Sequence, residues 1–332
     1  MIRKAHLLAL AIVGATALAS PGVAQQKIKL SVAHPPMGLY ALPTMVAQDG
    51  GFFAAEGLEV QDTYMAGGSA AAAAMIGGSA DATTGAMVRA VLLRAKGIKV
   101  KLLCAIAGIR DWAIVVDAKR HAGITSVSGL KGLKIATPRR GSDGDQIINW
   151  ILKGAGLKVG ADVSLVQIGG FNNHLIAMQK GDVDGSIMLE PFVSSGARKG
   201  SIIRVLDLMK AEGPKIFANR LWTGLLVKEE FLRKRPEVAA KMTRAITKAI
   251  RAIYADHDMA IAVAAKHMPS IGKDLLAEMI PRRLTITTGK AYLTSVSREA
   301  IAAENEYLAT IGRLKSKVAY EDVIATEMAK HW

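Results

Sequence analysis

The sequence predicts an α/β fold in two lobes, because short β-type runs alternate with helical runs along its first two thirds. Lys27 to His34 alternates like a strand, and Leu42 to Glu56 then has the pattern of a helix. A second series of strands and helices starts near Leu133 to Thr137. This alternation builds sheets with parallel strands and helices on their faces. Beyond Lys228 the pattern is helical, which predicts a helical C-terminal tail.

The remaining elements follow from the same patterns. In the first series we expect strands at 58–64, 80–84 and 100–107, and helices at 69–76 and 87–95. In the second series we expect helices at 144–154 and 175–180, and strands at 164–168 and 185–189. Apolar runs at 112–116 and 221–227 are placed at two hinge crossings between the lobes. The first lobe is therefore predicted to comprise 25–112 and 222–332, and the second lobe 113–221.

One segment pattern occurs twice. Gly67-Gly68 leads into a helical run and then to Asp81 before a short strand, and Gly169-Gly170 leads in the same way to Asp184. The second glycine and the aspartate are 13 residues apart in one copy and 14 in the other. Two copies, one in each half, predict lobes of similar construction that face a shared cleft; a solenoid would need at least about three.

The N-terminus has the pattern of a secretory signal peptide. Arg3 and Lys4 precede an apolar run of 13 residues from Leu7 to Ala19, and the small residues before Gln25 suit a signal peptidase. An uncleaved anchor helix is the alternative, but the run is shorter than the ~20 residues that span a bilayer. We therefore expect residues 1–24 to be removed and 308 residues to be exported, to the periplasm of a Gram-negative cell.

Cysteine content and charge exclude several classes of protein. Cys104 is the only cysteine, so neither a disulfide framework nor a thiolate metal cluster is expected, and no metal or cofactor is predicted. The formal charge of +15 would fall to +13 once Arg3 and Lys4 are cleaved. These cations are scattered along the chain and the protein is expected to be exported, so we expect no nucleic-acid partner. We interpret the positive charge mainly as a means of keeping the protein soluble, with a small preference for an anionic ligand.

Ligand contacts are expected where strands end and helices begin, because open α/β sheets bind ligands there and helix starts present unpaired N–H groups. Three such junctions carry small or polar residues, at Gly67 to Ala70, Gly141 to Asp145 and Gly169 to His174. Ser69 and Ser142 have a plain alternative as helix N-caps. The candidate ligand-binding residues from these junctions are Gly68, Ser69, Ala70, Ser142, Asp143, Asn172 and Asn173.

Four further candidates complete the predicted site. Tyr40 follows the first strand and could stack on a solute, or could pack between the lobes. Gly85 follows the third strand. Glu190 could place a carboxylate at the cleft mouth, or could be solvated or face a transporter. Trp222 is a candidate wall of the cleft, with interlobe packing as its alternative.

Several of these segments together resemble the solute-binding proteins of nitrate, sulfonate and taurine importers, a group that includes thiamine-precursor binders. The stretch from Gly51 to Val60 (GFFAAEGLEV) carries most of the resemblance, with Gly67-Gly68, Gly78 to Asp81, Gly181 to Asp184 and Glu190-Pro191. The resemblance covers about residues 27–230. It implies a type II periplasmic binding protein fold, hinge closure around one solute, and delivery to an ABC permease in the inner membrane. The doubled Gly50-Gly51 and the Asn172-Asn173-His174 run depart from the family pattern.

The resemblance predicts a binding protein rather than an enzyme, working as a monomer. Its first expected solute is an anion such as an organosulfonate, and the alternative is a neutral or aromatic precursor such as a thiamine pyrimidine. An enzyme of this fold that makes the thiamine pyrimidine would carry a cysteine-rich stretch, which the sequence lacks. A sensor-input protein that binds a solute and docks to a receptor is the other rival.

Overall fold

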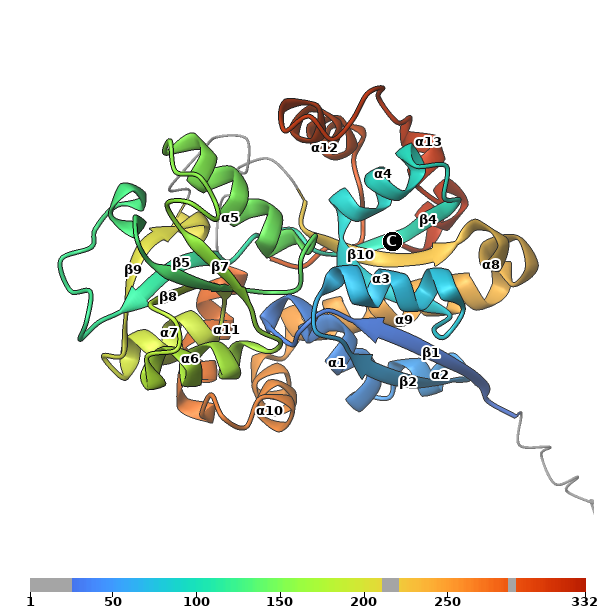
Figure 1. Ribbon diagram of the computed structural model, residues 1–332. Helices are drawn as coiled ribbons and strands as arrows, with labels where there is room; N and C mark the ends of the chain where they lie inside the picture. The colour runs from blue at the N-terminus through green and yellow to red at the C-terminus, as the bar shows by residue number, and fades with distance from the viewer. Residues whose placement is uncertain (1–25, 211–220, 286–290) are drawn as a thin grey trace, which may run out of the picture.

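The computed structural model describes residues 26–210, 221–285 and 291–332, and contains two five-stranded sheets (Figure 1). In the first sheet the strand order is β2-β1-β3-β10-β4. Strands β1, β2 and β3 run parallel, whereas β10 is antiparallel to both of its neighbours. Its strands are β1 (Ile28–His34), β2 (Leu58–Tyr64), β3 (Ala82–Ala86), β4 (Val100–Ala107) and β10 (Thr223–Lys228).

The second sheet repeats this plan in the order β7-β6-β8-β5-β9. Strands β6, β7 and β8 are parallel, and β5 is antiparallel to β8 and β9. Thus in each sheet the fourth strand in the order is antiparallel to both of its neighbours. The strands of the second sheet are β5 (Trp112–Asp117), β6 (Lys134–Thr137), β7 (Ser164–Gln167), β8 (Gly185–Leu189) and β9 (Ile202–Asp207). We call the two sheets with their helices the first and second lobes; the predicted residue boundaries of the lobes stay a prediction.

Helices cover both sheets. Those up to β10 are α1 (Leu42–Asp49), α2 (Phe52–Ala55), α3 (Gly68–Gly77), α4 (Met87–Ala95), α5 (Asp143–Gly154), α6 (Phe171–Lys180) and α7 (Phe192–Arg198). The tail adds α8 (Glu229–Lys234), α9 (Pro236–Ala255), α10 (His257–His267), α11 (Lys273–Leu284), α12 (Arg298–Thr310) and α13 (Tyr320–Val323). Short 3₁₀ turns are η1 (Leu39–Ala41), η2 (Val127–Leu130), η3 (Leu208–Lys210) and η5 (Thr326–His331). No helix within the described ranges is long and apolar enough to span a bilayer.

The prediction of a two-lobe α/β fold with a helical tail is confirmed, with two local corrections. The single helix expected from Leu42 to Glu56 is broken into α1 and α2, because Gly51 takes a left-handed φ of 72° that a helix interior does not accept. The sequence reasoning also missed α7 and β9, which lie in a stretch to which no element was assigned. The predicted signal peptide lies outside the described residues.

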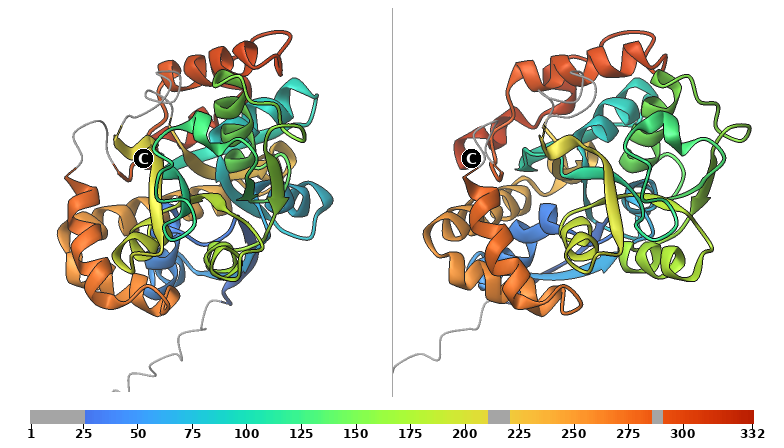
Figure 2. Two further views of the ribbon diagram at one scale, coloured as in Figure 1. Left: turned by 60° about the vertical axis from the view of Figure 1, so that its left-hand side comes forward. Right: turned by 90° about the vertical axis from the view of Figure 1, so that its left-hand side faces the viewer.

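The tail helices wrap around the outside of both sheets rather than forming a separate body (Figure 2). Helix α9 packs against α1, α2 and β4, and helices α12 and α13 pack against α4, all in the first lobe. Helix α11 instead reaches the second lobe, where Asp274 pairs with Arg198 of α7 at 2.9 Å. The tail therefore contacts both lobes along one side of the molecule.

The repeated sequence pattern corresponds to the same pair of hydrogen bonds in each lobe, made by the aspartate at its end. The amide of Asp81 donates to the Ser31 carbonyl and its carboxylate accepts from the Ser31 amide, both at 2.9 Å. Asp184 makes the same pair of bonds with Lys134, at 2.7 and 2.9 Å. Each aspartate thus ties the start of a parallel strand to its neighbour.

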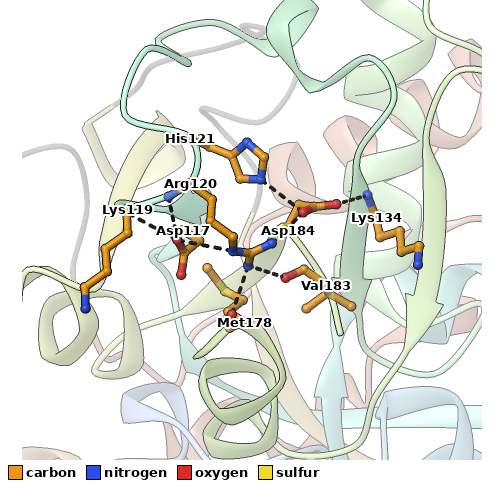
Figure 3. Close-up of polar contacts among 8 residues, drawn as sticks. All are labelled: Asp117, Lys119, Arg120, His121, Lys134, Met178, Val183 and Asp184. Carbon is orange, nitrogen blue, oxygen red and sulfur yellow. Dashed lines mark hydrogen bonds and ion pairs between the residues drawn. The ribbon is translucent and has the colours of Figure 1, made fainter. Parts of the chain in front are cut away.

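In the second lobe the Asp184 carboxylate also holds the chain that follows β5 (Figure 3). Arg120 Nη1 donates to Asp184 Oδ1 at 2.7 Å, and His121 Nε2 lies 3.0 Å from the same oxygen. Partial burial alone would raise the pKa of Asp184, but these contacts and the Lys134 amide outweigh it and lower the pKa. The network lies at the start of β6 and β8, so the opposite, carboxyl ends of these strands remain free to form a site.

Candidate ligand-binding site

A small cavity lies between the two sheets, where residues from both lobes meet. Its volume is about 40 Å³, which admits water but not an organic solute. A bound organic solute therefore needs more room than the cavity offers here. The residues that line it are Pro35, Pro36, Tyr40, Gly68, Ala72, Thr83, Thr84, Gly85, Ala86, Arg89, Trp112, Pro138, Ser142, Asp143, Phe171, Leu189, Trp222, Thr223 and Leu226.

Direct contacts between the lobes close this cavity. The Ser69 hydroxyl donates to the Arg140 carbonyl at 3.0 Å, and the Arg89 guanidinium donates to the Gly141 carbonyl. Gly67 faces the same loop so closely that a Cβ atom on it would lie 2.4 Å from Ser142 Oγ. The loop from Arg139 to Ser142 in the second lobe is thus packed against the start of α3 in the first.

The Asp143 carboxylate is the central polar group of the cavity. Its Oδ2 accepts hydrogen bonds from the indole N–H groups of Trp112 at 3.2 Å and Trp222 at 3.1 Å, and Arg110 Nε lies 3.8 Å away. Its Oδ1 is buried and has no hydrogen-bond partner among the residues that the structure describes, and the same holds for Thr223 Oγ1. Leaving a buried polar atom without a partner is costly, and both of these residues line the cavity.

Four of the side chains that line the cavity are aromatic. The Trp222 ring lies 5.0 Å from the Tyr40 ring and 6.0 Å from the Trp112 ring, measured between centroids. Trp112 in turn meets Phe171 edge to face at 5.7 Å. The Tyr40 hydroxyl donates to the Pro36 carbonyl at 2.9 Å, so this side chain offers the cavity its ring rather than its hydroxyl. Such walls favour a flat, largely apolar solute.

One cation and several helix starts also border the cavity. Arg89 lies in the first turn of α4, and burial is the main cause that lowers its pKa. The starts of α3 and α5 face the cavity at Gly68 and Asp143, and neither helix has a side-chain cap hydrogen bond. Their first amides can hold an anion, although Asp143 would oppose one at the start of α5.

Comparison with known proteins identifies the family to which this chain belongs. The model of the family described as NMT1/THI5 like matches residues 39–260, which is more than half of the chain. The chain belongs to the NMT1/THI5-like family. In a curated relative, YtlA of Bacillus subtilis strain 168, 223 residues are 24% identical, covering 67% of this chain and 65% of that protein. The match thus spans just under two thirds of YtlA.

Solved structures show the same fold. A protein of Bordetella bronchiseptica RB50 superposes with a TM-score of 0.79 at 25% identity, covering 92% of this chain and 96% of that one. The alkanesulfonate-binding protein SsuA from Xanthomonas axonopodis pv. citri, solved with MOPS bound, gives 0.70 at 16% identity, covering 89% and 97%. The chain therefore has the two-lobe fold of periplasmic binding proteins.

In this NMT1/THI5-like chain the structure brings six of the eleven sequence-predicted site residues to the cavity. They are Tyr40, Gly68, Gly85, Ser142, Asp143 and Trp222. Ser69 and Ala70 lie in the first turn of α3 but do not line it, and the Ser69 hydroxyl instead joins the lobes. Contact of any of these residues with ligand stays a prediction.

The other three predicted residues lie elsewhere. Asn172 exchanges hydrogen bonds with Ser270 of the tail at 3.0 and 3.3 Å, and Asn173 donates to the Gly169 carbonyl at 2.7 Å. Glu190 accepts from the amide and hydroxyl of Ser194 at 2.9 and 2.8 Å, and lines a separate pocket beside α11. Burial raises the pKa of Glu190.

Sequence reasoning missed Arg89, Phe171 and Thr223 as candidates. Arg89 follows β3 directly, so the rule that points to strand ends could have found it. Thr223 opens β10 beside Trp222, and its exposure to the cavity depends on pairing with β3 and β4. That pairing joins segments more than a hundred residues apart, and no local pattern reveals it.

A buried histidine supports the cavity wall from behind and makes stability depend on pH. His174 Nε2 donates to the Ile168 carbonyl at 2.9 Å, its Nδ1 accepts from the Ser186 hydroxyl at 2.7 Å, and its ring lies 5.1 Å from Phe171. Burial lowers the pKa of His174 from 6.5 to about 4. The unfolded chain therefore binds the proton first as the pH falls.

We expect the free energy of unfolding to fall by about 3 kcal/mol between pH 6.5 and pH 4 on account of His174, at ~1.4 kcal/mol per pH unit. Urea unfolding at a series of pH values measures this. His174→Gln, which keeps a donor for Ile168 but does not titrate, should flatten the profile in that window. An equally steep profile in the variant would rule out this origin.

Proposed function

We propose that this chain captures a small solute between its lobes and delivers it to the permease of an ABC importer. The cavity between the lobes carries the proposal. Its two buried polar atoms that have no hydrogen-bond partner among the described residues, Asp143 Oδ1 and Thr223 Oγ1, come from opposite lobes. A solute bound by both lobes favours the closed form over the open one. The family and the fold support this role, and the signal-peptide pattern supports a periplasmic location. In this proposal the chain works as a monomer.

An enzyme is less well supported by the cavity. Among the described residues that line it there is no cysteine, histidine, lysine or glutamate. Asp143 is the one carboxylate of that set, and one of its oxygens is occupied by two indole N–H groups. A nucleophile with an adjacent base, the usual arrangement for covalent catalysis, is not among these groups.

For the solute itself, we infer a small aromatic or heteroaromatic molecule that carries an N–H donor. Trp112, Trp222 and Phe171 provide rings for a flat solute, and Asp143 Oδ1 provides an acceptor with no other partner among the described residues. A thiamine-type aminopyrimidine has both features. This is the alternative solute from the sequence, and the geometry favours it over a simple anion.

An anionic solute is the second candidate, and Arg89 is the observation that favours it. Its guanidinium borders the cavity beside the uncapped start of α3. SsuA from Xanthomonas, which shares the fold, binds an alkanesulfonate. An aryl sulfonate would place its ring among the tryptophans and its charge near Arg89, but it would leave Asp143 Oδ1 without a donor.

A thermal-shift screen of the exported protein tests both candidates. The panel contains 4-amino-5-hydroxymethyl-2-methylpyrimidine, benzenesulfonate, taurine and nitrate. A ligand at 100 times its dissociation constant stabilises the folded chain by about 2.7 kcal/mol, so the aminopyrimidine should raise the melting temperature by several degrees. A shift only with benzenesulfonate or taurine would select the anion. No shift with any organic compound would remove the support for this solute class.

A further inference from the structure

A second, larger hollow lies outside the cavity, on the surface where the lobes meet. It is a groove of about 770 Å³ that is lined by residues of α5 and β7 in the second lobe and by residues at and just after the end of α12, which packs on the first lobe. We call it the α5–α12 groove. Its lining residues are Arg140, Asp145, Gln146, Asn149, Trp150, Lys153, Gly154, Val159, Gly160, Ser164, Leu165, Gln167, Thr310, Ile311 and Arg313.

The charge of the groove is positive and is not neutralised by ion pairs among the described residues. Arg140, Lys153 and Arg313 are exposed, and none of their side chains makes an ion pair with another residue in the described ranges. The only acid in the lining, Asp145, is buried and accepts from the Gly141 amide at 2.7 Å and from Asn149 at 3.3 Å. A partner therefore meets three cations and no exposed carboxylate.

Apolar side chains lie between these cations. Val159 is 42% exposed, which makes it one of three large apolar residues with exposed side chains in the described part of the chain. Leu165 on β7 and Ile311 after α12 are half-buried and line the same groove. Apolar groups with arginines around them are typical of a protein–protein interface.

The groove depends on closure of the lobes. Lys153 and Val159 belong to the second lobe, and Ile311 and Arg313 belong to the tail segment packed on α4 of the first lobe. The groove also adjoins the interlobe contact, since Arg140 lines it and accepts the Ser69 hydrogen bond. Opening the lobes would separate its two sides. A partner that fits both sides therefore binds the closed form more tightly than the open form.

We propose that the α5–α12 groove is the surface by which an acidic segment of the importer's membrane permease recognises the closed chain. Carboxylates of that segment pair with Lys153 and Arg313, one from each lobe, and its apolar side chains cover Val159 and Ile311. Because the two cations line one groove only when the lobes are closed, the empty open chain does not engage the permease in this way. The inference rests on the proposed function and adds to it the place and the chemistry of the contact.

Charge reversal on both sides of the groove tests this. The variant Lys153→Glu/Arg313→Glu places like charges against an acidic partner, while neither side chain lines the cavity. The matched control is Lys180→Glu/Arg251→Glu, which changes the same two residue types at exposed positions without ion pairs to described residues. In calorimetry, both variants should bind the compound that the thermal-shift screen selects with the same affinity as the natural chain.

Uptake is then measured in cells that lack the natural chain and carry one of the three proteins. The probe is carbon-14-labelled 4-amino-5-hydroxymethyl-2-methylpyrimidine, or labelled benzenesulfonate if the screen selects the anion. We expect the control to restore uptake and the groove variant to give about tenfold less, since each ~1.4 kcal/mol lost at an interface is tenfold in affinity.

The outcomes separate the two proposals. Full uptake with the groove variant overturns the docking surface and leaves the binding function intact. Loss of compound binding in solution by that variant also overturns it, because the two cations would then act at the cavity. If the natural chain itself restores no uptake, the importer function fails, and the docking surface fails with it.

Discussion

Gly67→Val is expected to weaken solute binding at least about tenfold while the free protein stays folded. The backbone of Gly67 is extended, with φ of 174°, so any residue is accepted there in the isolated lobe. In the closed form, however, a Cβ atom would lie 2.4 Å from Ser142 Oγ and 2.9 Å from Arg139 Cβ, both in the opposite lobe. The valine side chain therefore opposes closure without disturbing the core of either lobe.

Calorimetric titration with the panel compound measures the loss in affinity, and thermal unfolding of the free protein monitors its stability. The matched control is Gly77→Val. Gly77 is exposed at the far end of α3, the helix that begins after Gly67, and a Cβ atom added to it would meet no atom within 4 Å, so this variant should bind normally. Normal affinity in Gly67→Val would mean that the bound form does not bring these two segments together.

Asp143→Asn should weaken binding of the aminopyrimidine by about 30- to 150-fold, which corresponds to about 2–3 kcal/mol. The amide oxygen of the asparagine can still accept from Trp112 and Trp222, so its NH₂ group takes the place of Oδ1, which has no hydrogen-bond partner among the described residues. A solute N–H then meets a donor instead of an acceptor. Calorimetry on the natural protein and the variant measures the change.

The same variant separates the two solute classes by the sign of its effect. An anion gains from loss of the carboxylate charge, so benzenesulfonate should bind Asp143→Asn more tightly than it binds the natural chain. Thr63→Ala, on β2 outside the cavity lining, is the control and should change neither affinity. Unchanged binding of the aminopyrimidine by Asp143→Asn would exclude the carboxylate as its acceptor.

Most helices and strands could be predicted from the sequence because the spacing of apolar residues within each segment already indicates its secondary structure. The strand from Lys27 and the helix from Pro236 were found from their periodicity. The break at Gly51 was missed since an apolar helical pattern continues across it, and only the backbone angle shows that the chain turns. Strand β9 was missed because Ile202 to Asp207 (IIRVLD) does not alternate between apolar and polar residues.

The site was harder to predict, because it depends on which loops face each other. Gly68 and Ser142, from the predicted junctions after β2 and β6, do border the cavity, and their contact with a ligand stays a prediction. Asn172 belongs to the same kind of junction, but its partner is Ser270, which lies 98 residues away in the tail. Nothing near Asn172 in the sequence shows that the tail covers this helix start.

Small-angle X-ray scattering of the protein, with and without a saturating concentration of the compound that the thermal-shift screen selects, tests whether the lobes close around a solute. We expect the radius of gyration of the natural chain to fall when the compound binds, and that of the Gly67→Val variant to stay at the larger value. If calorimetry shows that the compound is bound and the radius does not change, closure around the solute is contradicted.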